Sequence, residues 1–476
     1  MMRRVVVCTV LLLAGLIAFN YAAQAQQAPT QNQMAREHWV GTWSTALTPR
    51  TQPPPPAPAV APAAAPAGAA GAPGAAPATG PDGAPARGRG GRGGRGGGEP
   101  TINRLPNGFV DSNPQDANSP RTFENLTYRQ NMASTIAGNR VRVVFSNRFG
   151  ATPLVIGGAS IALRGKDSSI VPGSSKPLTF GGQTNIRIPA RADYMSDAVV
   201  FNLPARTQFT VDMFLPDQVG TPTFHLSAFN DSFVSKPGNH VGAGEFPVER
   251  DTQSSYFIAR VEVTAPPTTG AVVVIGDSTT DGARNGMTNS RWPEVLADRL
   301  NARPGPRMAV LNAGHGGNSM LRGGAADASV ARFDRDVLAL AGVTHLIVHQ
   351  GITDIRANDA PSLEDMLSGY RQLIYRARAH GIKVIGATMT PIKNTGGYND
   401  VSKAKWEAIN NWVRTSGEFD GVIDFAKILA DPADPFIYQK DLTTDFTHPS
   451  EAGTLKMGTG IDLSLFTTAP SSSARR

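Results

Sequence analysis

Cysteine is almost absent from this chain, because Cys8 is the only one among 476 residues. It falls within the first 25 residues, which we expect to be removed, so the mature protein has no thiol. Disulfide bonds and cysteine-ligated metal sites are thereby excluded. Metal-ligand spacing is also missing, since none of the eight histidines stands in an H-E-x-x-H or comparable pattern. We therefore predict neither a metal ion nor a cofactor.

Long apolar runs are missing after the N-terminus. There, Arg3 and Arg4 precede a mostly apolar stretch at 5–19, and residues 23–25 (AQA) fit the small-x-small rule for signal cleavage. We predict a signal peptide at residues 1–25 and a secreted or periplasmic protein. A retained membrane anchor is the alternative, but the stretch is shorter than the ~20 residues of a membrane span. After signal removal we expect no stable membrane insertion.

A basic folded surface is missing as well, although the net charge is +7. Arg3 and Arg4 at one end, Arg475 and Arg476 at the other, and an arginine-rich segment within 51–98 account for that charge. The rest of the chain is formally neutral. The charge therefore does not indicate a nucleic-acid partner.

The segment 51–98 is rich in proline, alanine and glycine and ends in Arg-Gly repeats. It contains no apolar pattern that could form a core, so we predict a disordered insertion. RNA binding through the repeats is the alternative and would require a cytoplasmic mature protein. Because 38–44 already has the composition of a strand, the segment interrupts a folded region rather than preceding one.

Short alternating strands follow the insertion, with no clear helix among them. This pattern predicts a β-sandwich of jelly-roll type at 38–264. The expected strands are 38–44, 139–146, 185–188, 198–203, 207–215 and 255–263.

Strands and helices alternate after a proline-containing linker at 265–269, over residues 270–466. Five strands with crossover helices predict an α/β domain with a flavodoxin-like, five-stranded parallel sheet. Residues 467–476 are predicted to be a disordered tail. The expected strands are 272–275, 308–312, 345–349, 383–388 and 421–425, and the expected helices are 292–301, 328–340, 362–379, 401–415 and 451–466.

The first of these parallel strands ends in Gly276-Asp277-Ser278. Catalytic groups of α/β enzymes gather where such strands end, so Ser278 is a candidate nucleophile. The alternative is a serine that only caps the next helix.

Near the C-terminus, Asp445 precedes His448 by three residues. A serine hydroxyl needs an imidazole base, and that imidazole needs a carboxylate to fix its tautomer. Two small-residue loops, at 312–318 and 351–354, could supply donors to an oxyanion.

The ordered blocks GDS, glycine loop, G-x-x-D and D-x-x-H-P resemble the GDSL esterases, or SGNH hydrolases, over residues 271–465. The resemblance implies that Ser278 is the nucleophile, His448 the general base and Asp445 the residue that orients it. It implies oxyanion donors at the backbone N–H groups of Ser278 and Gly317. It also implies the flavodoxin-like fold, and bacterial two-domain members often carry a β-sandwich before the catalytic domain.

One position departs from the family pattern: Thr353 stands where its third block has an asparagine that donates to the oxyanion. A hydroxyl is a shorter donor and rotates freely. Either Thr353 fills the role, or Asn318 or Gln350 replaces it, or the enzyme is slow. Asp354 is expected to brace its loop, and His345 and His349 to be structural.

We therefore predict a secreted serine esterase that acts through an acyl-enzyme on a small-molecule or polysaccharide ester. The β-sandwich favours acetyl groups on carbohydrates, and a short-chain esterase or lipase is the close alternative. The competing class is a glycan-binding protein with a catalytically impaired SGNH domain. The sequence does not indicate an oligomeric state.

Overall fold

The computed structural model describes residues 37–49, 123–220, 222–226, 228, 230–282, 289–323 and 326–467. The predicted signal peptide, the insertion at 51–98 and the tail from 468 onward lie outside these residues. In the described part, no helix is long and apolar enough to cross a membrane.

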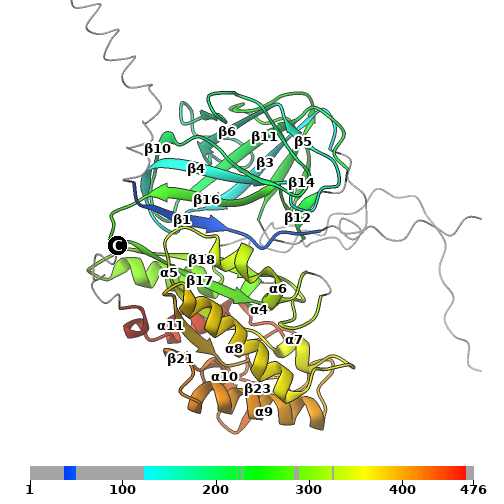
Figure 1. Ribbon diagram of the computed structural model, residues 1–476, viewed down its shortest axis with the longest axis vertical. Helices are drawn as coiled ribbons and strands as arrows, with labels where there is room; N and C mark the ends of the chain where they lie inside the picture. Colours follow the sequence, from blue (N-terminus) through cyan, green and yellow to red (C-terminus); the bar gives the residue numbers. More distant parts are fainter. Residues whose placement is uncertain are drawn as a thin grey trace, which may run out of the picture. The chain divides into compact units, whose positions relative to one another are not determined.

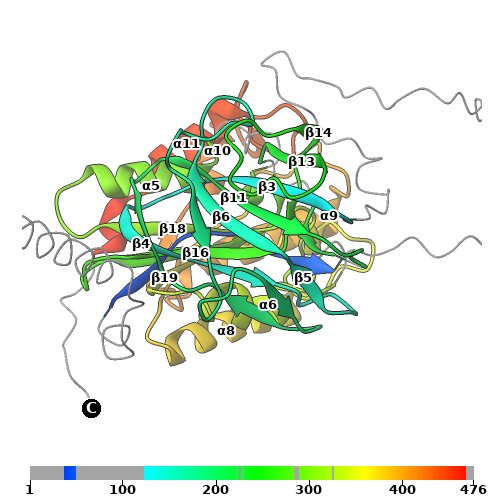
Figure 2. The same ribbon diagram turned by 90° about the horizontal axis from the view of Figure 1, so that it is seen from above.

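Antiparallel strands fill the region before residue 265. One sheet has the order β1-β16-β4-β10, with β9 also pairing with β4, and a second has the order β14-β13-β3-β11-β6-β7. Figure 2 shows β3, β11 and β6 of the second sheet side by side. The strands are β1 (Trp39–Ser44), β2 (Thr48–Pro49), β3 (Leu126–Ala133), β4 (Gly138–Ser146), β5 (Leu154–Ile156), β6 (Gly158–Leu163), β7 (Lys176–Leu178), β8 (Ile186–Ile188), β9 (Asp193–Met195), β10 (Val199–Leu203), β11 (Gln208–Leu215), β12 (Thr223–His225), β13 (Ser232–Pro237), β14 (Val248–Thr252), β15 (Ser255–Tyr256) and β16 (Ile258–Thr264).

After residue 269 the chain forms a parallel sheet with the order β18-β17-β19-β20-β21 (Figure 1). In chain order this is 2-1-3-4-5, so the predicted flavodoxin-like α/β fold with a preceding β-rich region is confirmed. The jelly-roll assignment stays a prediction. The elements are β17 (Gly270–Gly276), α4 (Ser278–Asp281), α5 (Trp292–Ala302), β18 (Met308–Gly314), α6 (Ser329–Phe333), the π-helix η2 (Asp334–Leu338), β19 (Val343–His349), α7 (Ile352–Ile355), α8 (Leu363–Ala379), β20 (Lys383–Ala387), α9 (Asp400–Thr415), β21 (Gly421–Ile423), α10 (Phe425–Leu429), the hairpin β22 (Ala430–Asp431) and β23 (Asp434–Tyr438), α11 (Glu451–Gly460) and the 3₁₀ turn η3 (Leu463–Phe466).

The β-branched run in β17 is buried on both faces of this sheet. Val272 and Val274 belong to one buried apolar cluster with residues of α5, α10 and α11, whereas Val273 and Ile275 belong to another that includes residues of α6, η2, α8 and α9. Side chains alternate between the faces of a strand, so an uninterrupted apolar run is what a central parallel strand requires.

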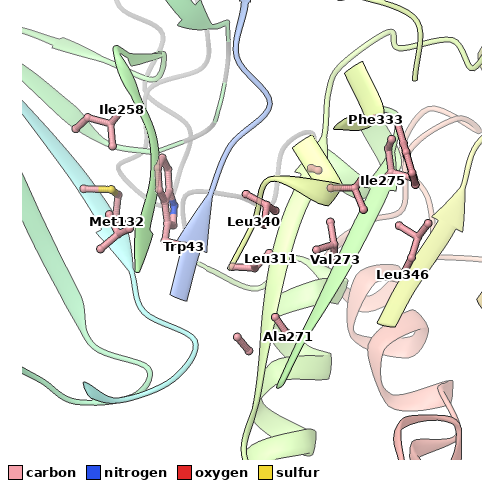
Figure 3. Packing of buried hydrophobic residues seen from close by; sticks show 14 of the residues in the cluster. Trp43, Met132, Ile258, Ala271, Val273, Ile275, Leu311, Phe333, Leu340 and Leu346 are labelled. Carbon is pink, nitrogen blue, oxygen red and sulfur yellow. The ribbon is translucent and has the colours of Figure 1, made fainter. Parts of the chain in front are cut away.

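The antiparallel and parallel regions belong to one compact unit. Figure 3 shows Trp43 and Met132 on the antiparallel side of a shared apolar cluster, with Val273 and Leu346 on the parallel-sheet side. Gly41 of β1 lets the strand approach β18, because a Cβ there would lie 2.7 Å from a methyl carbon of Leu311. The β-rich region is therefore packed directly on the α/β sheet.

Candidate active site

Three neighbouring strands of the parallel sheet, β18, β17 and β19, end in register. Gly276 at the end of β17 pairs with Gly314 of β18 and with His349 of β19. Ser278, Gly317 and Thr353 follow these three strand ends within a few residues. The chain order reverses between β17 and β19, which is where open α/β sheets bind ligands.

Ser278 is presented by a sharp turn from strand to helix. Gly276 makes the turn possible, because a Cβ there would lie 2.2 Å from the Thr280 hydroxyl oxygen. The cap of α4 is Asp277, whose carboxylate accepts the Thr279 N–H at 2.9 Å. The hypothesis that Ser278 serves as the helix cap is therefore wrong, and its hydroxyl is free for another partner.

The loop before α11 folds around Asp445. One carboxylate oxygen accepts the backbone N–H groups of His448 at 2.7 Å and of Thr447 at 2.9 Å. The other oxygen accepts from Nδ1 of the His448 ring at 2.8 Å. Burial raises the pKa of Asp445, but these hydrogen bonds outweigh it and hold the pKa at about 2. The carboxylate is thus ionised and fixes the ring.

The structure brings Ser278, His448 and Asp445 together. Nε2 of His448 lies 2.9 Å from Oγ of Ser278. Because Nδ1 donates to a carboxylate, Nε2 is left to accept the serine proton. The His448 and Asp445 side chains are 24% and 28% exposed, so a substrate can reach this chain of hydrogen bonds.

The two other predicted oxyanion residues lie at the same sheet edge. Gly317 is exposed, and its φ of 69° is one that favours glycine. Thr353 lies in α7 and is partly exposed.

Asn318 and Gln350 do not replace the missing asparagine. The Asn318 amide is buried, donates to the Asp327 carbonyl at 2.9 Å, and accepts from Ser329 and Arg332. The Gln350 amide nitrogen donates to both Asn318 and Ser329. Both N–H groups of Gln350 are therefore already used, and both amides belong to a buried hydrogen-bond network around Ser329, so Thr353 remains the expected third donor.

Asp354 has a structural role, but it holds the segment that follows the glycine loop rather than its own loop. Its carboxylate accepts the backbone N–H groups of Met320 at 2.8 Å and Leu321 at 3.2 Å. The predicted structural role of His349 also holds. Its Nδ1 contacts the Thr280 hydroxyl at 2.9 Å, and burial lowers its pKa to about 3.

Arg332, which no sequence motif marks, is fully buried beneath the site. Its guanidinium donates to the carbonyls of Gly276 and Ala313, at the ends of β17 and β18, and pairs with Asp336 at 2.9 Å. A lone arginine in an expected helix gives no local signal of such a role.

Asp277 provides a pH-dependent prediction. Burial raises its pKa to about 6, against the opposing effects of the Thr279 hydrogen bond and of His448, whereas an unfolded Asp titrates near ~3.9. Between these two pKa values, Asp277 is protonated in the folded state and ionised in the unfolded state. The contribution of Asp277 to the free energy of unfolding therefore falls as the pH rises. Asp277→Asn can still cap α4, and its stability relative to wild type should rise from pH 4 to above pH 6. Urea midpoints of both proteins across this range test this; a constant difference contradicts it.

In the described part of the chain, no cluster of three or more His, Cys, Asp or Glu residues is arranged to hold a metal ion. The chemistry visible at the site is that of a serine hydroxyl, an imidazole and a carboxylate beside backbone donors.

Comparison with known proteins assigns this region. Residues 274–455 match the model of the GDSL-like Lipase/Acylhydrolase family. The chain therefore carries a domain of the GDSL-like lipase/acylhydrolase family, whose general activity is ester hydrolysis. No protein of curated function matches the sequence.

Solved structures of the same kind cover a similar part of the chain. A protein from Desulfitobacterium hafniense DCB-2, described as lipolytic and of the G-D-S-L family, is 26% identical, with 40% of this chain and 96% of that one covered and a TM-score of 0.33. The aryl esterase of M. smegmatis is 15% identical, with 40% and 95% covered and a TM-score of 0.33. A GDSL-like lipase from Bacteroides thetaiotaomicron is 17% identical, with 41% and 87% covered and a TM-score of 0.32.

Proposed function

We propose that this protein is a secreted serine esterase that hydrolyses carboxylic esters through an acyl-enzyme. The observation that carries the proposal is the unbroken chain of hydrogen bonds from Ser278 Oγ through the His448 ring to Asp445. This arrangement turns a weakly nucleophilic hydroxyl into a group that can attack an ester.

In the first half of the reaction, Ser278 Oγ forms a bond to the ester carbonyl carbon while its proton passes to Nε2 of His448. The negative charge that develops on the carbonyl oxygen is stabilised by the N–H groups of Ser278 and Gly317, with the Thr353 hydroxyl as a third donor. His448 then gives the proton to the leaving alkoxide oxygen, and the alcohol departs.

In the second half, water attacks the acyl carbon, and His448 takes its proton. The same donors stabilise the second tetrahedral intermediate. When that intermediate collapses, the acid leaves and the proton returns to Ser278. No cofactor enters this sequence.

We propose acetyl groups on carbohydrates as the substrate class, and a secreted or periplasmic location. The β-rich region before the catalytic domain supports the carbohydrate substrate, and the signal-like residues 1–25 support the secreted or periplasmic location. The substrate of the site is then an ester of a polysaccharide or of a small molecule.

The test measures the hydrolysis of acetyl esters and of a long-chain ester, and the binding of an acetylated polysaccharide. The purified chain is expected to release p-nitrophenol from p-nitrophenyl acetate and acetate from an acetylated polysaccharide, and a p-nitrophenyl ester of a long fatty acid should react much more slowly. Folded protein that binds the polysaccharide but cleaves no ester would favour the glycan-binding alternative, which the Thr353 departure motivates. Preference for the long-chain ester would instead indicate a lipase.

A further inference from the structure

A buried chain of polar contacts connects the antiparallel region to the active-site turn. His225, in β12, lies with its Nδ1 atom 2.5 Å from the Thr45 hydroxyl and its Nε2 atom 3.1 Å from a carboxylate oxygen of Asp281. His225 is 2% exposed and Asp281 is 4% exposed. Because a carboxylate can only accept, Nε2 of His225 donates to Asp281.

Asp281 in turn joins two parts of the active site. It is the last residue of α4, three residues after Ser278, and its backbone N–H donates to the Asp277 carbonyl at 2.9 Å. The carboxylate oxygen that faces His225 also accepts the Gly316 N–H at 2.9 Å. Gly316 directly precedes Gly317, the proposed oxyanion donor. The position of Asp281 therefore affects the glycine loop as well as the nucleophile turn.

The glycine loop is packed too tightly to adjust independently. A Cβ on Gly314 would lie 2.4 Å from the backbone nitrogen of Asp281. On the other side, the His315 ring stacks on His225 with centroids 4.5 Å apart and planes at 16°. His315 also contacts the Gly316 carbonyl through Nδ1 at 2.9 Å. His225 thus contacts the loop by stacking and holds it through Asp281.

The charge on Asp281 suits this arrangement. Burial raises its pKa, but the nearby His225, His315 and Arg291 outweigh that effect and keep it below the usual range. An ionised carboxylate accepts the Gly316 N–H more strongly than a neutral group would.

We propose that His225 is a positioning residue for ester hydrolysis: through Asp281 it fixes residues 316 and 317 against α4, in the geometry that holds the oxyanion. The antiparallel region then completes the active site of the α/β domain instead of only adjoining it. This inference rests on the proposed function.

The test measures kcat and KM for p-nitrophenyl acetate in the full chain. His225→Ala should lower kcat by about 10–100-fold, less than the 100–1,000-fold of a deleted oxyanion donor, with KM changed by no more than about twofold. His225→Gln retains an N–H that can reach Asp281 and should recover most of the kcat. The matched control is His240→Ala, since the ring of this histidine of the same region contacts the Pro237 carbonyl in its own loop; it should leave kcat unchanged.

A boronic acid separates positioning from general damage to the fold. It adds to an active-site serine and presents an oxygen where the oxyanion would be, so its inhibition constant should rise in His225→Ala by the same factor as kcat falls. If His225→Ala does not fold, Asp281→Ala replaces it with the same expectations. The inference would be overturned if the variant that folds keeps the wild-type kcat while Ser278→Ala is inactive. That result would leave the proposed function intact. A wild-type chain that cleaves no ester would instead overturn the proposed function.

Discussion

Ser278→Ala is expected to lower kcat for p-nitrophenyl acetate by roughly 10⁴–10⁶-fold, and His448→Ala by a similar factor. Each change removes one end of the 2.9 Å contact through which the hydroxyl loses its proton. Because the two residues act as one unit, the double variant should be no slower than either single variant.

His380→Ala serves as the matched control for His448→Ala. His380 follows α8, and its ring contacts the Arg376 carbonyl near the surface, so kcat should stay at the wild-type value. Effects of Ser278→Ala and His448→Ala that multiply in the double variant would mean that the two residues act independently. That result would contradict the proton transfer between them.

Asp445→Asn is expected to lower kcat by about 10⁴-fold while the protein remains folded. The amide can still accept the backbone N–H groups that now bind the carboxylate. Its NH₂ group then faces Nδ1 of His448 and favours the tautomer that carries hydrogen on Nε2. In that tautomer the ring cannot accept the Ser278 proton.

The thermal midpoint and the KM of Asp445→Asn serve as controls, and both should stay near the wild-type values. A variant that keeps a tenth or more of the wild-type kcat would show that another group orients His448. A large fall in the thermal midpoint would show instead that Asp445 acts mainly by holding its loop together.

The parallel sheet was predictable because its strands carry continuous β-branched runs, as in β17. The helix predicted at 362–379 is α8, and the Ser362 hydroxyl caps it by accepting the Asp365 N–H. The predicted helix at 328–340 is instead α6 followed by the π-helix η2, in which the Ala339 N–H donates to the Asp334 carbonyl. A composition pattern does not distinguish these hydrogen-bond registers.

Other differences arise where tertiary contacts override local pattern. The strand expected at 255–263 is broken by Phe257, which has a φ of 59°. The expected strand 421–425 ends at Ile423, because Asp424 caps α10. Strand β3 was missed because its Arg129 obscures the alternation, yet the structure buries that arginine in an ion pair with Asp212 at 2.7 Å.

For the active site as well, residues in short sequence motifs could be predicted, whereas residues that act through tertiary contacts could not. Ser278, Asp445 and His448 were found because ordered short motifs mark strand ends and loops. Asp281 was not found, because no short motif marks its contact: Asp277 caps α4, and Asp281 holds the Gly316 N–H. His225 gave no signal, since its contact with Asp281 spans 56 residues and depends on how two regions pack.

Covalent trapping of the nucleophile with a fluorophosphonate, followed by peptide mapping, tests the role of Ser278 directly. One adduct is expected, on Ser278, which forms in wild type and is lost or greatly slowed in His448→Ala. Folded protein that stays unlabelled, or that carries the adduct on a different residue, would contradict the assignment of Ser278 as a nucleophile activated by His448.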